Sequence, residues 1–170
     1  YVRAHNIDPT NHRALFQMAV IELYDRKQPD KAVEHLLAAE KLQPGDRDVL
    51  YQLGRYYATL EKPDVAKALG YLDRALVEDP NYAPAMYYKG VMLAAKDDAK
   101  GADKAFREAI AIDPKYAPAW RDLGELYESY DQQDAAAVIY DKGTEYADET
   151  VDLYNNLGML KMEAQQPKEA

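Results

Sequence analysis

The most regular feature of the chain is a series of short amphipathic segments separated by polar breaks. Within each segment, apolar residues recur at intervals of three and four, which is the spacing of one face of an α-helix. The pattern predicts helices in pairs. The first helices of the pairs are expected over 11–25, 47–60, 83–96, 117–130 and 151–164, and the second helices over 30–42, 64–78, 99–112 and 133–146. We therefore expect an all-α protein built from helix pairs.

These helix pairs recur along the chain with a period of about 34 residues. The stretches DPNYAPAMYYKGVML and DPKYAPAWRDLGELY begin at Asp79 and Asp113, 34 residues apart. Prolines in the same register lie at Pro9, Pro44, Pro80 and Pro114, and Asp148 stands where the next one would fall. We interpret residues 1–170 as a single array, with full units at 12–46, 47–82, 83–116 and 117–150, the end of a truncated unit at 1–11 and the start of another at 151–170.

Small residues recur in the middle of each first helix, at Ala19, Gly54, Gly90, Gly124 and Gly158. Glycine costs a helix about 1 kcal/mol relative to alanine, so its recurrence indicates that a neighbouring helix approaches closely at this point. The second helices carry alanine in register, at Ala32, at Ala66 or Ala68, at Ala102 and at Ala136. Large residues follow at Leu36, Leu72, Phe106 and Tyr140, and by position Tyr57, Tyr127, Tyr140 and Tyr154 are also assigned to packing. Trp120 is expected to be buried within its unit.

This set of small and large positions resembles the tetratricopeptide repeat. The residues that carry the resemblance are Ala102, Phe106, Ala109, Pro114, Trp120, Leu123, Gly124, Tyr127, Ala136 and Tyr140. The resemblance implies a right-handed superhelical solenoid of antiparallel helix pairs. The longer second unit, with KPDVAKALGYLDRAL at 62–76, is similar to the Sel1-like repeat, which shares this architecture. The chain departs from the pattern at Glu22, where tyrosine is usual, at Gly143 and at Asp148.

In this family the first helices line a concave groove that binds peptides, and the resemblance implies which residues do so here. The predicted groove residues are Phe16, Val20, Tyr51, Arg55, Tyr87, Tyr88, Val91, Arg121, Asp122, Glu125, Glu128, Asn155 and Asn156. The groove is expected to be aromatic and aliphatic toward the N-terminus, and acidic and amide-rich toward the C-terminus. Exposed aromatic side chains would then anchor a protein or peptide partner that has apolar anchors and some basic residues. The alternative is that Tyr51, Tyr87 and Tyr88 only pack laterally across adjacent first helices.

The best-known groove chemistry of the family, a clamp of Lys, Asn and Arg for an acidic C-terminus, is not expected here. Reading units one to three, the clamp positions hold Phe16, Val20, Gln52, Pro84 and Tyr88.

Charge and composition narrow the class of partner. The chain of 170 residues has a formal net charge of −9, and most of the surplus of acid lies in its second half. This net negative charge argues against nucleic acid as a partner and against docking on anionic lipid. No apolar run approaches the roughly 20 residues of a membrane span, so direct membrane insertion is not expected. The absence of cysteine excludes disulfides, and the cytoplasm and the periplasm both stay open as compartments.

Residues for catalysis are scarce. His5, His12 and His35 are interpreted as solvated surface histidines, and Asp97 and Asp98 as a polar turn. No phosphate-binding loop, dinucleotide fingerprint or metalloprotease motif occurs, so no enzyme, cofactor or metal site is predicted.

Two functions therefore remain open. The first is a non-catalytic scaffold that binds a peptide or helix in its groove. The alternative is a regulatory or self-assembly domain of a larger polypeptide, including one whose catalytic domain lies outside this sequence. Apolar end faces around 1–4 and 159–170 also predict end-to-end self-association.

Overall fold

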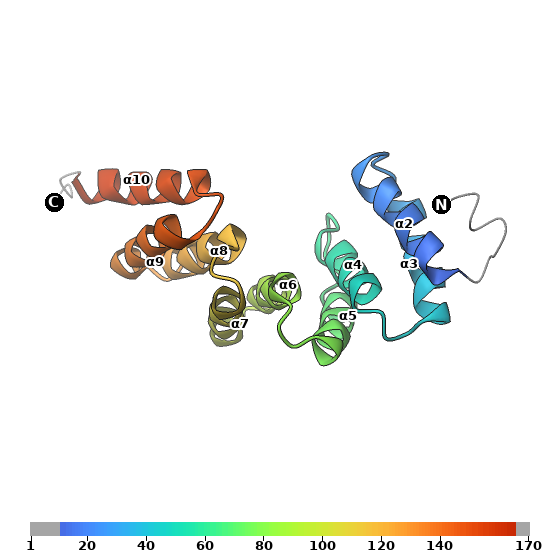
Figure 1. Cartoon of the computed structure of the whole chain (residues 1–170). Helices are drawn as coiled ribbons and strands as arrows, with labels where there is room; N and C mark the ends of the chain where they lie inside the picture. The colour runs from blue at the N-terminus through green and yellow to red at the C-terminus, as the bar shows by residue number, and fades with distance from the viewer. Residues whose placement is uncertain (1–10, 166–170) are drawn as a thin grey trace. The chain divides into compact units, whose positions relative to one another are not determined.

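The computed structural model describes residues 11–165, and its regular elements there are all helices (Figure 1). They are α2 His12–Tyr24, α3 Pro29–Leu42, α4 Arg47–Ala58, α5 Val65–Glu78, α6 Ala83–Ala94, α7 Ala99–Ile112, α8 Ala117–Glu128, α9 Gln133–Tyr146 and α10 Val151–Gln165. Every predicted helix is confirmed, with bounds that agree within two residues. The partial unit predicted at 1–11 lies outside the described residues, except for Asn11.

The chain divides into two compact units, 1–80 and 81–170, which we call the N-terminal half and the C-terminal half. In the N-terminal half, α2 packs against α3, α4 against α5, and α3 against α4. In the C-terminal half, α6 packs against α7 and α8 against α9, while α10 contacts both α9 and α8. Each half has a core of its own, the first built around Leu36 and Leu53, the second around Phe106, Trp120 and Tyr140.

The glycines of the first helices are the points of closest helix approach. A Cβ at Gly54 would lie 2.7 Å from Leu72, and one at Gly90 would lie 2.7 Å from Phe106. Gly124 is contacted still more closely by the ring of Tyr140, whereas a Cβ at Gly158 would have no heavy atom within 4 Å. The close approach predicted from the sequence is thus confirmed in three repeats.

The alanines and aromatic residues settle several positions that the sequence left open. Ala68 is completely buried and Ala66 is exposed, so Ala68 is the packing residue of the second repeat. Trp120 is buried as predicted, and its Nε1 donates a hydrogen bond of 2.8 Å to the Pro114 carbonyl. The assignment of Tyr154 to packing is wrong, because it lies on the outer side of α10 and is 59% exposed.

Tight turns join the two helices of most repeats. Lys27, Asp97 and Asp131 each take a positive φ between 53° and 59° in these turns. Asp98 then caps α7 by accepting a hydrogen bond of 3.0 Å from the Gly101 backbone amide. The interpretation of Asp97 and Asp98 as a polar turn is therefore confirmed.

A buried carboxylate distinguishes the first repeat. Glu22 is 6% exposed, and its Oε2 lies 2.7 Å from Nδ1 of His35 on α3. His35 is consequently not a solvated surface histidine, which corrects the interpretation from the sequence. Because a buried carboxylate without a partner is costly, this pair ties α2 to α3 at the position where the repeat pattern departs from tyrosine. His12 lies 3.6 Å from Asp46, and His5 falls outside the described residues.

The contrast between Gly124 and Gly158 gives a direct test of the packing. Gly124→Ala drives a methyl group into the ring of Tyr140 and should destabilise the protein by about 1–3 kcal/mol. Gly158→Ala meets open space and should stabilise it by about 0.5–1 kcal/mol, because alanine favours the helix. Urea unfolding followed by circular dichroism measures both changes. Equal effects of the two substitutions would contradict the packing described here.

Candidate peptide-binding face

The predicted groove residues of the C-terminal half lie on three first helices, of which α8 contacts both α6 and α10. We call their common surface the α6–α8–α10 face. It comprises Tyr87, Tyr88, Val91, Arg121, Asp122, Glu125, Glu128, Asp152, Asn155 and Asn156.

Tyr87 joins α6 to α8 from within this face. Its hydroxyl donates a hydrogen bond of 2.7 Å to Oδ2 of Asp122, and its ring packs edge-on against Tyr88 and Tyr116. Burial, followed by the charge of Asp122, raises the pKa of Tyr87 far above its ordinary value, so the hydroxyl stays a donor at neutral pH. Only 8% of Tyr87 is exposed. The expectation that Tyr87 stands exposed as an anchor is therefore wrong, and the lateral-packing alternative describes it correctly.

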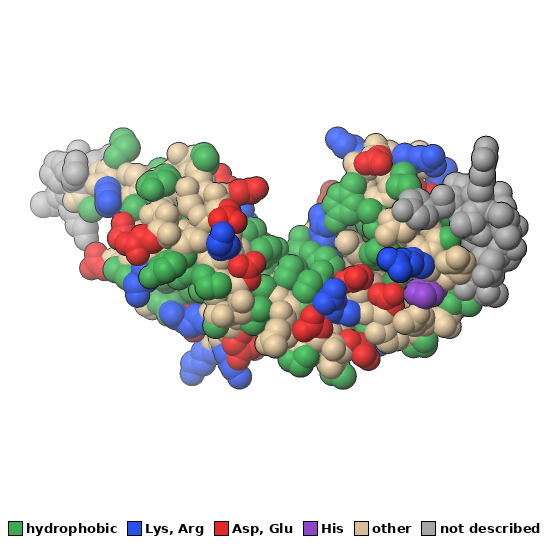
Figure 2. All heavy atoms as spheres, in the orientation of Figure 1, with side chains coloured by type: hydrophobic (Ala, Val, Ile, Leu, Met, Phe, Trp, Pro, Cys, Tyr) green, Lys and Arg blue, Asp and Glu red, His purple; other side chains and the backbone are tan. Residues whose placement is uncertain are grey.

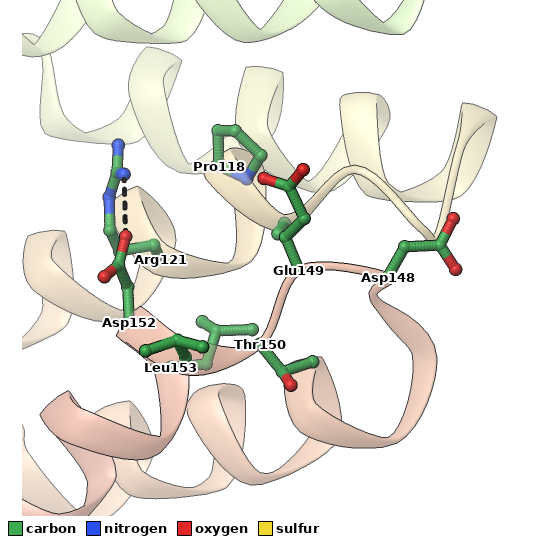
Figure 3. A pocket seen from close by; sticks show the side chains of 9 residues that line it. Pro118, Arg121, Asp148, Glu149, Thr150, Asp152 and Leu153 are labelled. Atoms are coloured by element: carbon green, nitrogen blue, oxygen red, sulfur yellow. Dashed lines mark ion pairs between the residues drawn. The ribbon is translucent and has the colours of Figure 1, made fainter.

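Arg121 is surrounded by carboxylates. Its Nε donates a hydrogen bond of 2.8 Å to Oδ1 of Asp122 and lies 3.7 Å from Oε1 of Glu125. Its Nη1 lies 3.8 Å from Oδ2 of Asp152 at the start of α10, beside a hollow of about 440 Å³ (Figure 3). One guanidinium thus faces three carboxylates, and the cluster carries a net negative charge.

Glu125 is the most accessible acid of α8 on this face. Its side chain is 54% exposed, and Oε1 accepts a hydrogen bond of 3.5 Å from Nδ2 of Asn156. Partial burial, followed by repulsion from Asp122, raises the pKa of Glu125, although Arg121 and Asn156 act in the opposite direction. A cation brought to this carboxylate would relieve the repulsion.

Glu128, by contrast, is tied to the core. Its Oε1 accepts a hydrogen bond from the hydroxyl of Tyr140, the residue whose ring packs against Gly124. Burial, followed by this hydrogen bond, raises the pKa of Tyr140 above its ordinary range. The Tyr140 hydroxyl therefore fixes the position of one carboxylate of the face.

The N-terminal half carries the other four predicted residues. Phe16, Val20 and Tyr51 are half-buried, and Phe16 packs against the core. Arg55 donates a hydrogen bond to the hydroxyl of Tyr24 and lies over its ring, 5.1 Å from the ring centroid.

Two residues of these surfaces, Tyr24 and Tyr140, were not predicted as groove residues. Tyr24 lies at a groove position of the first helix, so the repeat register could have found it. The register does find Asp152, which lies one residue after the start of α10 as Asp48 does in α4. The role of Tyr140 at the face had no such signal, because its position in the repeat indicates only packing.

Between residues 11 and 165, no three His, Asp or Glu side chains gather closely enough to hold a metal ion. Across the same residues, no helix combines the length and the apolar character that crossing a bilayer requires.

Comparison with protein families agrees with the repeat geometry. The tetratricopeptide repeat model matches residues 18–83 and 61–117, which together make up more than half of the chain. The chain belongs to the tetratricopeptide repeat family. Its tetratricopeptide fold is an all-α repeat of helix pairs, as the sequence predicted.

Individual relatives share this repeat. The TPR repeat-containing protein MJ0941 of Methanocaldococcus jannaschii is 34% identical over 73 residues, covering 43% of this chain and 22% of that protein. Protein O-mannosyl-transferase TMTC3 of Homo sapiens is 24% identical over 175 residues, covering 94% of this chain and 19% of that protein. The chain thus spans about a fifth of the length of these curated relatives. The crystal structure of MamA is similar with a TM-score of 0.75 at 25% identity, covering 86% of this chain and 84% of MamA.

The raised pKa of Glu125 predicts a pH dependence of stability. The folded state holds the Glu125 proton more tightly than the unfolded state does. The contribution of Glu125 to the stability of the fold therefore falls as the pH rises from 4.5 through the raised pKa. Glu125→Gln should therefore unfold at higher urea concentration than the wild type at pH 7, and the difference should shrink below pH 4.5. A carboxyl-carbon NMR titration that places Glu125 at or below the pKa of a free glutamate would contradict this.

Proposed function

We propose that the α6–α8–α10 face binds a basic segment of a partner protein, in extended or helical form. Tetratricopeptide arrays are scaffolds for protein interaction, and this chain shares their fold. The observation that carries the finer proposal is the acidic cluster around Arg121, where Glu125 and Asp152 are more than half exposed.

The chemistry of the ligand follows from the accessible groups. A lysine or arginine of the partner would meet Glu125 and Asp152. The negative charge there exceeds the positive charge of Arg121. Apolar side chains of the partner would meet Tyr88 and Val91, which are half-buried beside the core. In the N-terminal half, Phe16 and Tyr51 stay predicted contacts for an apolar anchor.

Exposed carboxylates act mainly on the rate of encounter. Their attraction for a basic segment extends over about a Debye length, so added salt should slow association more than it speeds dissociation. Buried apolar contacts set the dissociation rate instead.

Variants of opposite charge test the proposal with one probe, a fluorescent synthetic peptide of leucines and lysines. Glu125→Lys should weaken binding about tenfold or more, because it reverses one accessible charge. Arg121→Gln should tighten binding, because it removes the cation that competes with the ligand. Lys104→Ala, on the exposed side of α7, serves as the control and should leave the affinity unchanged. Fluorescence anisotropy measures all three, and an unchanged affinity in Glu125→Lys would refute the proposal.

A second candidate function is self-assembly, as a regulatory or assembly region of a larger polypeptide. The chain's match to TMTC3, a protein named as a transferase, covers 19% of that protein, consistent with a repeat region joined to other domains. The specific observation is the outer side of α10, where Val151, Tyr154, Met159 and Met162 are each at least 59% exposed and Gly158 lies open. Two copies could bury this side against each other in a two-fold contact.

Sedimentation distinguishes this second candidate from the first. The wild-type chain should show a concentration-dependent increase in mass at high protein concentration, and Tyr154→Glu should abolish it. Binding of the leucine–lysine peptide should be unaffected by Tyr154→Glu. A strict monomer at about millimolar concentration would exclude self-assembly through α10.

A further inference from the structure

We infer that the C-terminal half has a second docking surface, a groove between α7 and α9 that fits an amphipathic segment with acidic side chains. This surface belongs to the second helices of the repeats and goes beyond the function proposed for the first helices.

The groove is apolar at its centre. Its hollow of about 530 Å³ has Ile110 on one wall, Val138 and Ile139 on the other, and Trp120 at its base. Val138 is 56% exposed, which leaves a branched apolar side chain in contact with water. In the space-filling view, hydrophobic side chains reach the surface over α9 and lysine and arginine side chains gather over α7 (Figure 2). A hollow of this size accommodates apolar side chains of a bound segment.

In the N-terminal half, an ion pair occupies the equivalent place. There Arg74 of α5 reaches across to α3, where its Nη2 lies 2.7 Å from Oε1 of Glu40 and 2.9 Å from the Pro44 carbonyl. The guanidinium also lies over the ring of Tyr71, 5.5 Å from the centroid. An ion pair therefore bridges these two second helices.

At the equivalent positions of the C-terminal half the cation is present, but the carboxylate that would pair with it is not. Counting from the buried alanines of the second helices, Ile110 takes the place of Glu40 and Lys142 takes the place of Arg74. No carboxylate forms an ion pair with Lys142 within residues 11–165. The bridge is thus replaced by an apolar wall and an available ammonium group.

The other cation at the rim, Arg107, is already paired, which leaves Lys142 to select the charge of the ligand. Arg107 is held by Asp103 through contacts of 3.0 and 3.1 Å and donates a hydrogen bond of 2.9 Å to the Tyr127 hydroxyl. An apolar side chain between Ile110 and Val138 would bring a flanking aspartate or glutamate to Lys142, as Glu40 is brought to Arg74. A basic segment would be repelled by Lys142 instead, so the groove and the α6–α8–α10 face select opposite charges.

Trp120 makes the groove directly observable, since it is the one tryptophan of the chain and lines the hollow. The probe is a synthetic helical peptide with leucines on one face and glutamates on the other. Titrating it into the whole chain should change the Trp120 emission, and the dissociation constant should rise about tenfold or more in Val138→Glu and in Lys142→Glu. Lys161→Glu makes the same charge change on α10 and should alter the constant by less than about twofold.

Three results would overturn the inference once circular dichroism shows that the variants are folded. The first is an unchanged Trp120 emission on adding the leucine–glutamate peptide. The second is equal binding of that peptide by the wild type and Lys142→Glu. The third is a dimer in sedimentation that Val138→Glu abolishes, since a second copy would then be the occupant. Glu125→Lys should leave binding of the acidic peptide intact, so the groove is tested independently of the α6–α8–α10 face.

Discussion

Everything else in this fold depends on one packing contact, in which a large side chain of the second helix fills the space above a glycine of the first. Leu72 occupies this space at Gly54, Phe106 at Gly90 and Tyr140 at Gly124. The contact brings the two backbones close enough to bury the flanking alanines, and the loss of helix propensity at glycine is offset by that burial. Because the core of a pair is filled in this way, the outer sides of both helices are left free to carry other chemistry.

Tyr140 shows how this core contact also organises the surface. Its ring packs on Gly124, while its hydroxyl donates a hydrogen bond to Glu128 on the α6–α8–α10 face. Leucine or phenylalanine in the same place could fill the space but could not hold a carboxylate. Tyr87 acts similarly one repeat earlier, on α6, since its buried ring leaves only the hydroxyl to reach Asp122. Two carboxylates of the face are thus held in position by groups that belong to the core.

The sequence predicts what depends on periodicity and misses what depends on contacts across helices. Apolar spacing and the proline register locate every described helix within two residues, because both reflect local backbone preference. The register also tells which side of a helix a residue lies on, and this placed Glu125 and Asn156 correctly on neighbouring first helices. It does not tell what a side chain meets there. Tyr87 lies at a predicted groove position yet is buried by Tyr88 and Tyr116, and Glu22 is buried because His35 lies on the facing helix.

Equivalent positions of the second helices differ in charge between the two halves. Glu40 and Arg74 satisfy each other, so the groove of the N-terminal half has no charge left over at that point. In the C-terminal half, the change to Ile110 removes the acid but the cation persists as Lys142. A charge that serves no structural partner costs little at an exposed position, yet it selects the charge of whatever binds beside it. The C-terminal half therefore presents acid on its first helices and, within residues 11–165, an unpaired lysine beside an apolar groove on its second helices, so the two surfaces that we propose as docking sites differ in charge.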